Sequence, residues 1–167
     1  MILTIIQKLS NYHIIRISFF LLLTTLILDS FNCKSQSVKN PLNNELFFTI
    51  LRDSLGIQKI PNKVLILSEE GCFKCNQQLA KFIYNNANQN ILFIIANSGS
   101  RIDYSNIQEL KQENIIYNYS NFFRRNSLIG ENSAYITLKK NKIDTLININ
   151  PRNFNKTIAF IGQELKN

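Results

Sequence analysis

Apolar residues recur along this chain in two patterns, one typical of buried strands and one of amphipathic helices. The runs at residues 63–68 and 90–96 are short, apolar and bounded by polar, turn-forming residues, as expected of strands buried on both faces. Helical spacing occurs at residues 42–57 and from Cys72 to about Asn86. We therefore predict a helix, a strand, a second helix and a second strand in this half of the chain.

The following residues predict a further helix and a β-hairpin. Ser105-Asn106-Ile107-Gln108 has the form of a capping box and predicts a helix that runs to about Glu113. Residues 134–139 and 142–149 favour strands, and Lys140-Asn141 between them is typical of a tight hairpin turn.

The last helix is expected to begin at Asn150-Pro151, because asparagine is a common N-cap and proline is favoured at the first helical position. Residues 114–132 show no clear pattern. The resulting order over residues 42–167 is α-β-α-β-α-β-β-α. This order predicts one α/β domain with a central mixed β-sheet flanked by helices.

Residues 1–32 differ in character from the rest of the chain. An uncharged apolar run of 12 residues, 17–28, follows Lys8 and Arg16. A membrane span needs about 20 apolar residues, so this arrangement favours a signal peptide, with an uncleaved membrane anchor as the alternative. Both interpretations predict export across a bacterial inner membrane.

Cys33 lies five residues beyond the apolar run, a position that resembles that of the lipidated cysteine in bacterial lipoprotein signals. The preceding residues, Ser30-Phe31-Asn32, depart from the usual pattern of leucine followed by small residues. Lipidation of Cys33 and an unmodified cysteine therefore stand as alternatives. Residues 33–41 are polar, as expected of a tether. We predict a protein of the bacterial cell envelope that is anchored to the membrane and faces the periplasm.

The chain carries a net charge of +8, from 19 basic and 11 acidic side chains. Residues 1–32 contribute +1 through Lys8, Arg16 and Asp29, so the rest of the chain keeps +7. Such a balance raises the question of a nucleic-acid partner. The basic residues stand singly or in short groups such as Arg124-Arg125, and no long basic helix is predicted. We therefore expect no nucleic-acid partner.

Cys72 and Cys75 form a C-x-x-C motif that follows the first predicted strand and opens the next helix. A cysteine at a helix N-terminus meets unpaired backbone N–H groups and the positive end of the helix dipole, and both favour the thiolate. Lys74 adds a positive charge, whereas Glu69 and Glu70 oppose it. We predict that Cys72 is the exposed nucleophile and that Cys75, one turn along, is the resolving thiol.

With this motif in this context, residues 62–167 resemble the thioredoxin-like superfamily, and the arrangement resembles bacterial membrane-tethered members of it. The resemblance implies thiol–disulfide exchange with protein thiols and disulfides and with an upstream redox partner, and it leaves the direction open. Two features depart from the family. No proline stands near Asn132-Ser133, where thioredoxins carry a cis-proline before the hairpin, and Gly71 replaces the tryptophan that precedes the first cysteine.

The main alternative is a non-catalytic envelope lipoprotein that binds a protein partner and holds Cys72 and Cys75 as a structural disulfide. A zinc site usually needs four ligands, and the one histidine, His13, lies in the leader. We therefore expect no metal and no cofactor within one chain, while a metal shared between two chains stays open. The same histidine count excludes Ser-His and Cys-His catalytic pairs from the folded region.

Two further groups of residues have competing interpretations. Glu69 and Glu70 are either proton carriers for Cys75 or solvated turn residues, and we favour the second. Residues 122–125 form either a partner-binding patch or the edge of the core with a solvated basic end, and again we favour the second. A peroxidase of the peroxiredoxin type is disfavoured, because Glu69 stands three residues before Cys72 where such enzymes carry threonine.

Overall fold

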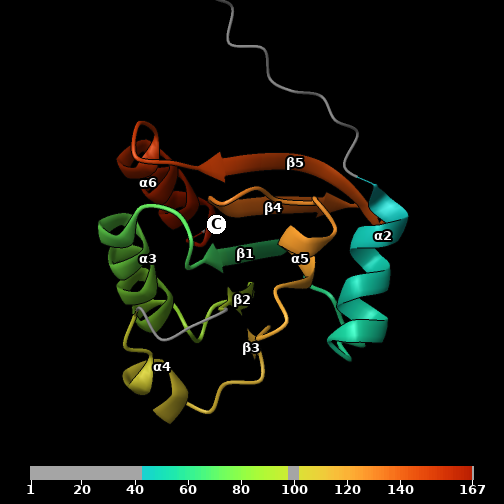
Figure 1. Cartoon of the computed structure of the whole chain (residues 1–167), viewed down its shortest axis with the longest axis horizontal. Helices are drawn as coiled ribbons and strands as arrows, with labels where there is room; N and C mark the ends of the chain where they lie inside the picture. Colours follow the sequence, from blue (N-terminus) through green and yellow to red (C-terminus); the bar gives the residue numbers. More distant parts are fainter. Residues whose placement is uncertain (1–42, 98–101, 167) are drawn as a thin grey trace, which may run out of the picture. The chain divides into compact units, whose positions relative to one another are not determined.

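A five-stranded β-sheet organises the computed structural model, which describes residues 43–97 and 102–166 (Figure 1). The strands lie in the order β3-β2-β1-β4-β5. Their bounds are β1 Lys63–Ser68, β2 Leu92–Ala96, β3 Ile115–Tyr117, β4 Ser133–Lys139 and β5 Lys142–Ile149. The helices of this part are α2 Asn44–Thr49, α3 Phe73–Asn85, α4 Ser105–Glu109, α5 Phe122–Arg125 and α6 Phe154–Glu164, and a short π-helix, η1 Ile50–Ser54, continues α2.

The central strand of the sheet is β1. It pairs in parallel with β2, where Ile66 lies opposite Ile94, and antiparallel with β4, where Ile66 lies opposite Ala134. β3 extends the parallel side, and β5 pairs antiparallel with β4 at the other edge. The predicted α/β architecture, a mixed sheet flanked by helices, is confirmed.

The predicted hairpin joins β4 and β5 through Lys140-Asn141. Both turn residues have positive φ, 51° and 58°, which is the geometry of the tight turns that match the twist of paired strands. The predicted hairpin is therefore confirmed, as are the first two predicted strands.

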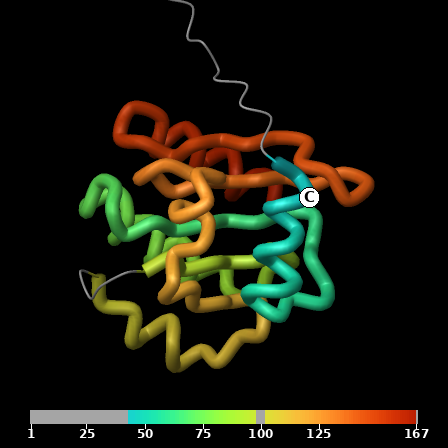
Figure 2. The backbone as a smooth tube through the Cα atoms, turned by 45° about the vertical axis from the view of Figure 1, so that its right-hand side comes forward, coloured from blue at the N-terminus to red at the C-terminus, as the bar shows by residue number. Residues whose placement is uncertain are grey.

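Side chains on the two faces of the sheet build two cores, because successive residues of a strand point to opposite faces. On one face, Leu65 of β1 packs with residues of α3, α4 and α6. On the other, Ile66 packs with residues of α2, η1 and α5. Figure 2 shows α2–η1 in cyan and the orange segment with α5 side by side, and Phe47 and Phe123 join them with ring centroids 5.9 Å apart.

The prediction that α6 begins at Asn150-Pro151 is wrong. α6 begins at Phe154, with Asn153 as its N-cap. The Asn150 side-chain oxygen accepts hydrogen bonds from the backbone N–H groups of Arg152 and Asn153, at 3.0 and 3.3 Å. Asn150 therefore stabilises a turn ahead of the helix, which asparagine does as readily as it caps.

The predicted capping box at Ser105 is also wrong. α4 begins at Ser105 itself, Tyr104 is its N-cap, and the helix ends at Glu109 rather than near Glu113. The Asp103 side chain accepts a hydrogen bond from the Ser105 backbone N–H at 2.9 Å. An aspartate two residues upstream thus takes the N–H group that the capping box needs, and this hydrogen bond lowers the pKa of Asp103.

Candidate functional site

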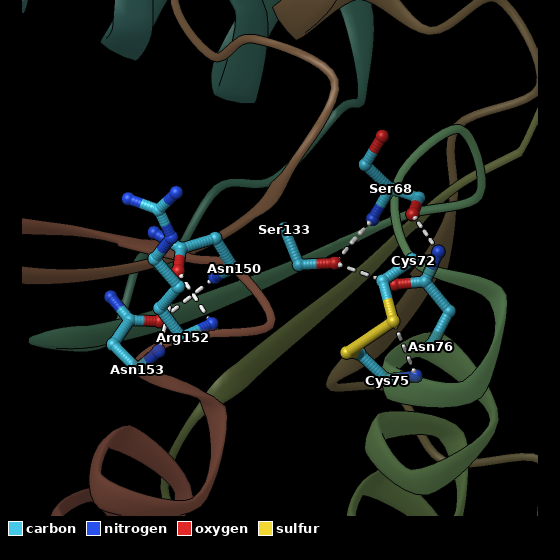
Figure 3. The surroundings of a disulfide bond; sticks show 8 residues. All are labelled: Ser68, Cys72, Cys75, Asn76, Ser133, Asn150, Arg152 and Asn153. Carbon is cyan, nitrogen blue, oxygen red and sulfur yellow. Dashed lines mark hydrogen bonds between the residues drawn. A yellow bond between two sulfur atoms is a disulfide. The ribbon is translucent and has the colours of Figure 1, made fainter.

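Cys72 and Cys75 are brought together as a disulfide at the start of α3 (Figure 3). Their Cα atoms are 5.2 Å apart. Cys72 is the N-cap residue, and its sulfur accepts a hydrogen bond from the Cys75 backbone N–H at 3.3 Å. The sulfur therefore lies at the helix end where backbone N–H groups lack partners within the helix and where the dipole is positive.

The motif lies at the boundary between solvent and core. Cys72 and Cys75 are half-buried, while Lys74 is exposed and Phe73 is 53% exposed. Cys75 also packs against the core on the α3 side of the sheet. One cysteine of the pair thus contacts the apolar interior, and the residues between the two cysteines face solvent.

Three buried polar residues join the end of β1, the first turn of α3 and the start of β4 (Figure 3). The Ser133 hydroxyl accepts a hydrogen bond from the Ser68 backbone N–H at 3.0 Å and donates one to the Asn76 side-chain oxygen at 3.2 Å. The Asn76 amide nitrogen donates to the Ser68 carbonyl oxygen at 2.6 Å. Since the Asn76 backbone N–H also donates to the Cys72 carbonyl oxygen at 2.9 Å, the network reaches the turn that carries the disulfide.

Gly71 packs against the segment that leads into β4. A Cβ atom at this position would lie 3.0 Å from the Glu131 carbonyl oxygen and 3.5 Å from the Asn132 side-chain oxygen. A tryptophan therefore has no room here unless this segment moves. The contact also places Asn132, near which the resemblance implies a proline, beside the residue that precedes Cys72.

Glu69 is buried, so the expectation that it is a solvated turn residue is wrong. Its backbone N–H donates to the Ala96 carbonyl oxygen at 3.3 Å, which holds the turn against the end of β2. Only 4% of Glu69 is exposed, and the Tyr104 hydroxyl interacts with its carboxylate. Burial, followed by the negative charge of Glu69, raises the pKa of Tyr104. Tyr104 comes from a distant part of the chain, so no local pattern around Glu69 could have indicated this burial.

Glu70 is half-buried and forms an ion pair with Arg124 of α5. The Arg124 guanidinium also lies 3.7 Å from the Glu131 carboxylate. One positive charge thus lies between carboxylates on the two segments that meet at Gly71. Phe123 of the same helix is fully buried, so residues 122–125 form an edge of the core, whose basic end is partly ion-paired rather than only solvated.

Sequence reasoning missed the polar network of Ser68, Asn76 and Ser133. Asn76 offered a signal, because it stands on the apolar stripe of its helix together with Leu79 and Ile83. A polar residue on such a stripe is buried and needs hydrogen-bond partners. Its partners are distant in sequence, so the signal predicts a network without naming its members.

Several predicted features fall outside the part of the chain that the structure describes. These are the leader at residues 1–32, the tether at 33–41, the candidate lipidation site Cys33 and the histidine His13. Within residues 43–97 and 102–166, no three His, Cys, Asp or Glu side chains gather as metal ligands. No helix in those two ranges has the length and hydropathy needed to cross a membrane.

Comparisons of the chain with known protein families, with curated proteins and with solved structures found no match. What the structure itself defines is an α/β protein with a half-buried disulfide at a helix N-terminus. This disulfide follows the end of β1, the central strand of the mixed sheet, and lies near the point where β4 begins.

Proposed function

We propose that this protein carries out thiol–disulfide exchange through Cys72 and Cys75. The observation that carries the proposal is the half-buried disulfide at the N-terminus of α3, where the Cys75 backbone N–H donates to the Cys72 sulfur. A thiolate is the nucleophile in exchange, and a helix N-terminus favours the thiolate. Protein thiols and disulfides are the substrates that a motif open to solvent on one side can reach.

In the reductive direction, the Cys72 thiolate attacks one sulfur of a substrate disulfide. A mixed disulfide forms, and the other substrate sulfur leaves as a thiolate that takes up a proton. The Cys75 thiol then loses its proton and attacks the Cys72 sulfur, which releases the second substrate thiol and re-forms the Cys72–Cys75 disulfide. Two electrons have passed to the substrate. An upstream dithiol protein then supplies two electrons that reduce the Cys72–Cys75 disulfide again. The same steps in reverse oxidise a substrate dithiol.

A thioredoxin-like fold is part of the proposal. The chain order of β1, the disulfide at the start of α3, β2, α4, the β4–β5 hairpin and α6 agrees with what the resemblance implies. The approach of the Glu131 carbonyl oxygen to Gly71 supports the same assignment, because in that family the segment before the hairpin faces the cysteines. β3 and α5 are additional elements between α4 and the hairpin.

The sequence also supports a location in the bacterial cell envelope, with residues 1–32 as signal peptide or anchor. Cys33 is then the point of lipid attachment that holds the domain at the membrane. Radioactive palmitate tests this assignment, and we expect label on the wild-type chain and none on Cys33→Ala. Equal labelling of both chains excludes lipidation at Cys33.

A trapping experiment in a bacterial host tests the exchange activity. Cys75→Ser retains the Cys72 nucleophile but cannot resolve the mixed disulfide, so we expect covalent adducts on non-reducing gels that disappear on reduction. The matched controls, Cys72→Ser and the double variant, should form no such adducts. If Cys75→Ser forms no more adducts than the double variant, the proposed exchange is refuted.

A non-catalytic envelope protein with a structural disulfide is the competing proposal. The contact of Cys75 with the core favours it, because a sulfur that packs against the core is partly shielded from reductants. On that proposal, the wild-type disulfide resists dithiothreitol in the folded protein, and Cys75→Ser traps no partner. Rapid reduction without unfolding excludes this alternative.

A further inference from the structure

We propose that Asn76 and Ser133 are positioning residues that set the reduction potential of the Cys72–Cys75 pair. The inference deepens the exchange activity proposed above and rests on it. Neither side chain has a hydrogen bond to a cysteine sulfur among its contacts in the network. They act on the pair through the backbone of the first turn of α3.

The network is closed and shielded from water. Ser68 is 0%, Asn76 3% and Ser133 2% exposed. Each of the three residues shares a hydrogen bond with both of the others, through side-chain or backbone groups. Hydrogen bonds are stronger in such surroundings than in water, and an unpaired partner is correspondingly costly. The three segments are therefore held in one arrangement.

Two hydrogen bonds donated by backbone N–H groups connect this network to the cysteines. The Asn76 backbone N–H donates to the Cys72 carbonyl oxygen at 2.9 Å, and the Cys75 backbone N–H donates to the Cys72 sulfur at 3.3 Å. Asn76 follows Cys75 directly in the chain. A shift of Asn76 therefore moves the N–H group that stabilises negative charge on the Cys72 sulfur.

The position of Asn76 argues against a purely packing role. It lies on the apolar stripe of α3, where Leu79 and Ile83 are fully buried. An apolar side chain here would bury more apolar surface in this core. Asparagine instead forms two side-chain hydrogen bonds, one to Ser68 of β1 and one to Ser133 of β4. The side chain thus fixes where the helix begins relative to those strands.

The network matters more in the reduced protein than in the oxidised one. In the oxidised protein, the disulfide itself holds Cys72 against Cys75. In the dithiol this covalent link is absent, so the N–H groups that favour the Cys72 thiolate depend more strongly on the hydrogen bonds of Asn76 and Ser133. Loss of the network therefore destabilises the reduced form more than the oxidised form, and the reduction potential falls.

Equilibration of the full-length chain with glutathione tests this inference. Two glutathione thiols reduce the Cys72–Cys75 disulfide, and glutathione disulfide and the protein dithiol are formed, with transfer of two electrons and two protons. We expect Ser133→Ala to lower this equilibrium constant about three- to tenfold, which is a fall of up to about 30 mV. The rate of Cys72 alkylation should reach half its maximum at a higher pH than in the wild type.

Two further variants and one control complete the design. Asn76→Ala removes the second member of the network without weakening the helix, since alanine has the highest helix propensity, and it should act in the same direction. Ser133→Thr keeps the hydroxyl and should retain the wild-type equilibrium constant and the wild-type pH dependence of alkylation. Ser120→Ala, at an exposed position, is the matched control and should change neither quantity. Thermal unfolding of each oxidised variant shows that the comparison is made on folded protein.

Two different outcomes separate this inference from the proposed function. If Ser133→Ala and Asn76→Ala melt earlier but keep the wild-type potential and alkylation profile, the network is only structural and the inference is overturned. If the wild-type pair fails to equilibrate with glutathione at all, the exchange activity is overturned and the inference with it.

Discussion

Gly71→Ala adds one carbon atom where the turn before Cys72 comes closest to the segment before β4. The new Cβ would lie 3.0 Å from the Glu131 carbonyl oxygen and 3.6 Å from the Asn132 Cα atom. Carbon–oxygen contacts ordinarily begin at about 3.3 Å. The Glu131 oxygen belongs to the backbone and cannot rotate away, so the segment must move by a few tenths of an ångström.

The size of the effect follows from two opposing contributions. Overpacking of this kind costs about 1–3 kcal/mol. The backbone at Gly71 is not in the left-handed region, so alanine brings no backbone strain. Alanine also lowers the conformational entropy of the unfolded chain, which stabilises the folded protein by about 0.4–1 kcal/mol. With each contribution taken near the middle of its range, we expect a net loss of about 1–2 kcal/mol. For a folded region of this size, the melting temperature should fall by about 4–8 °C.

Thermal unfolding of the oxidised full-length chain, followed by circular dichroism, measures this loss. Gly130→Ala is the matched control, because a Cβ at Gly130 meets nothing within 4 Å and its backbone is not left-handed either. The control should melt at or slightly above the wild-type temperature. If Gly71→Ala melts at the same temperature as the control, the two segments do not approach each other as closely as described. The support that this contact gives to the proposed fold is then lost.

Three further predictions concern other parts of the molecule. Gly162→Ala should stabilise the protein by about 0.5–1 kcal/mol in urea unfolding, because alanine favours the helix and its Cβ meets only the Phe82 ring, at 4.0 Å; a loss of stability would contradict this packing. Arg124→Gln removes the ion pair to Glu70. Melting at low and high salt should show a loss in the free energy of unfolding below about 1 kcal/mol, and this loss should become smaller as the salt concentration rises. A loss that does not depend on salt would point to packing instead. Burial raises the pKa of Tyr135 from 10.0 to about 12, so the stability that its neutral form contributes is complete below pH 10.0 and is lost as the pH rises through about 12. Tyr135→Phe should therefore flatten the fall of the urea midpoint over this range, and an unchanged slope would refute that assignment.

The parts of the fold that could be predicted are those whose pattern is local. β1 could be predicted from the sequence because both of its faces are buried, so its residues form an almost unbroken apolar run. The start of α3 is readable because a C-x-x-C motif follows that run directly. Lys140-Asn141 is readable because a tight turn needs residues of its kind between two strand-like segments.

The features that could not be predicted depend on contacts between distant residues. β3 is only three residues long and gains its place by pairing with β2, so residues 114–132 show no pattern of their own. From the sequence, Glu69 is expected to be a solvated turn residue, yet it is buried in the folded chain and interacts with the distant Tyr104. Asn150-Pro151 satisfies the rules for a helix start, yet the same asparagine stabilises a turn. In the candidate site, the cysteines could be predicted, whereas Ser133 could not, because its role exists only where β4 meets β1.

The reduction potential of the wild-type Cys72–Cys75 pair tests the central claim most directly. Dithiol oxidoreductases have potentials between about −270 and about −120 mV, whereas structural disulfides of exported proteins lie below about −300 mV. Thiol–disulfide exchange as the function predicts a value inside the first range, reached reversibly from both the oxidised and the reduced protein. A value below about −300 mV, or a disulfide that opens only when the protein unfolds, would contradict it.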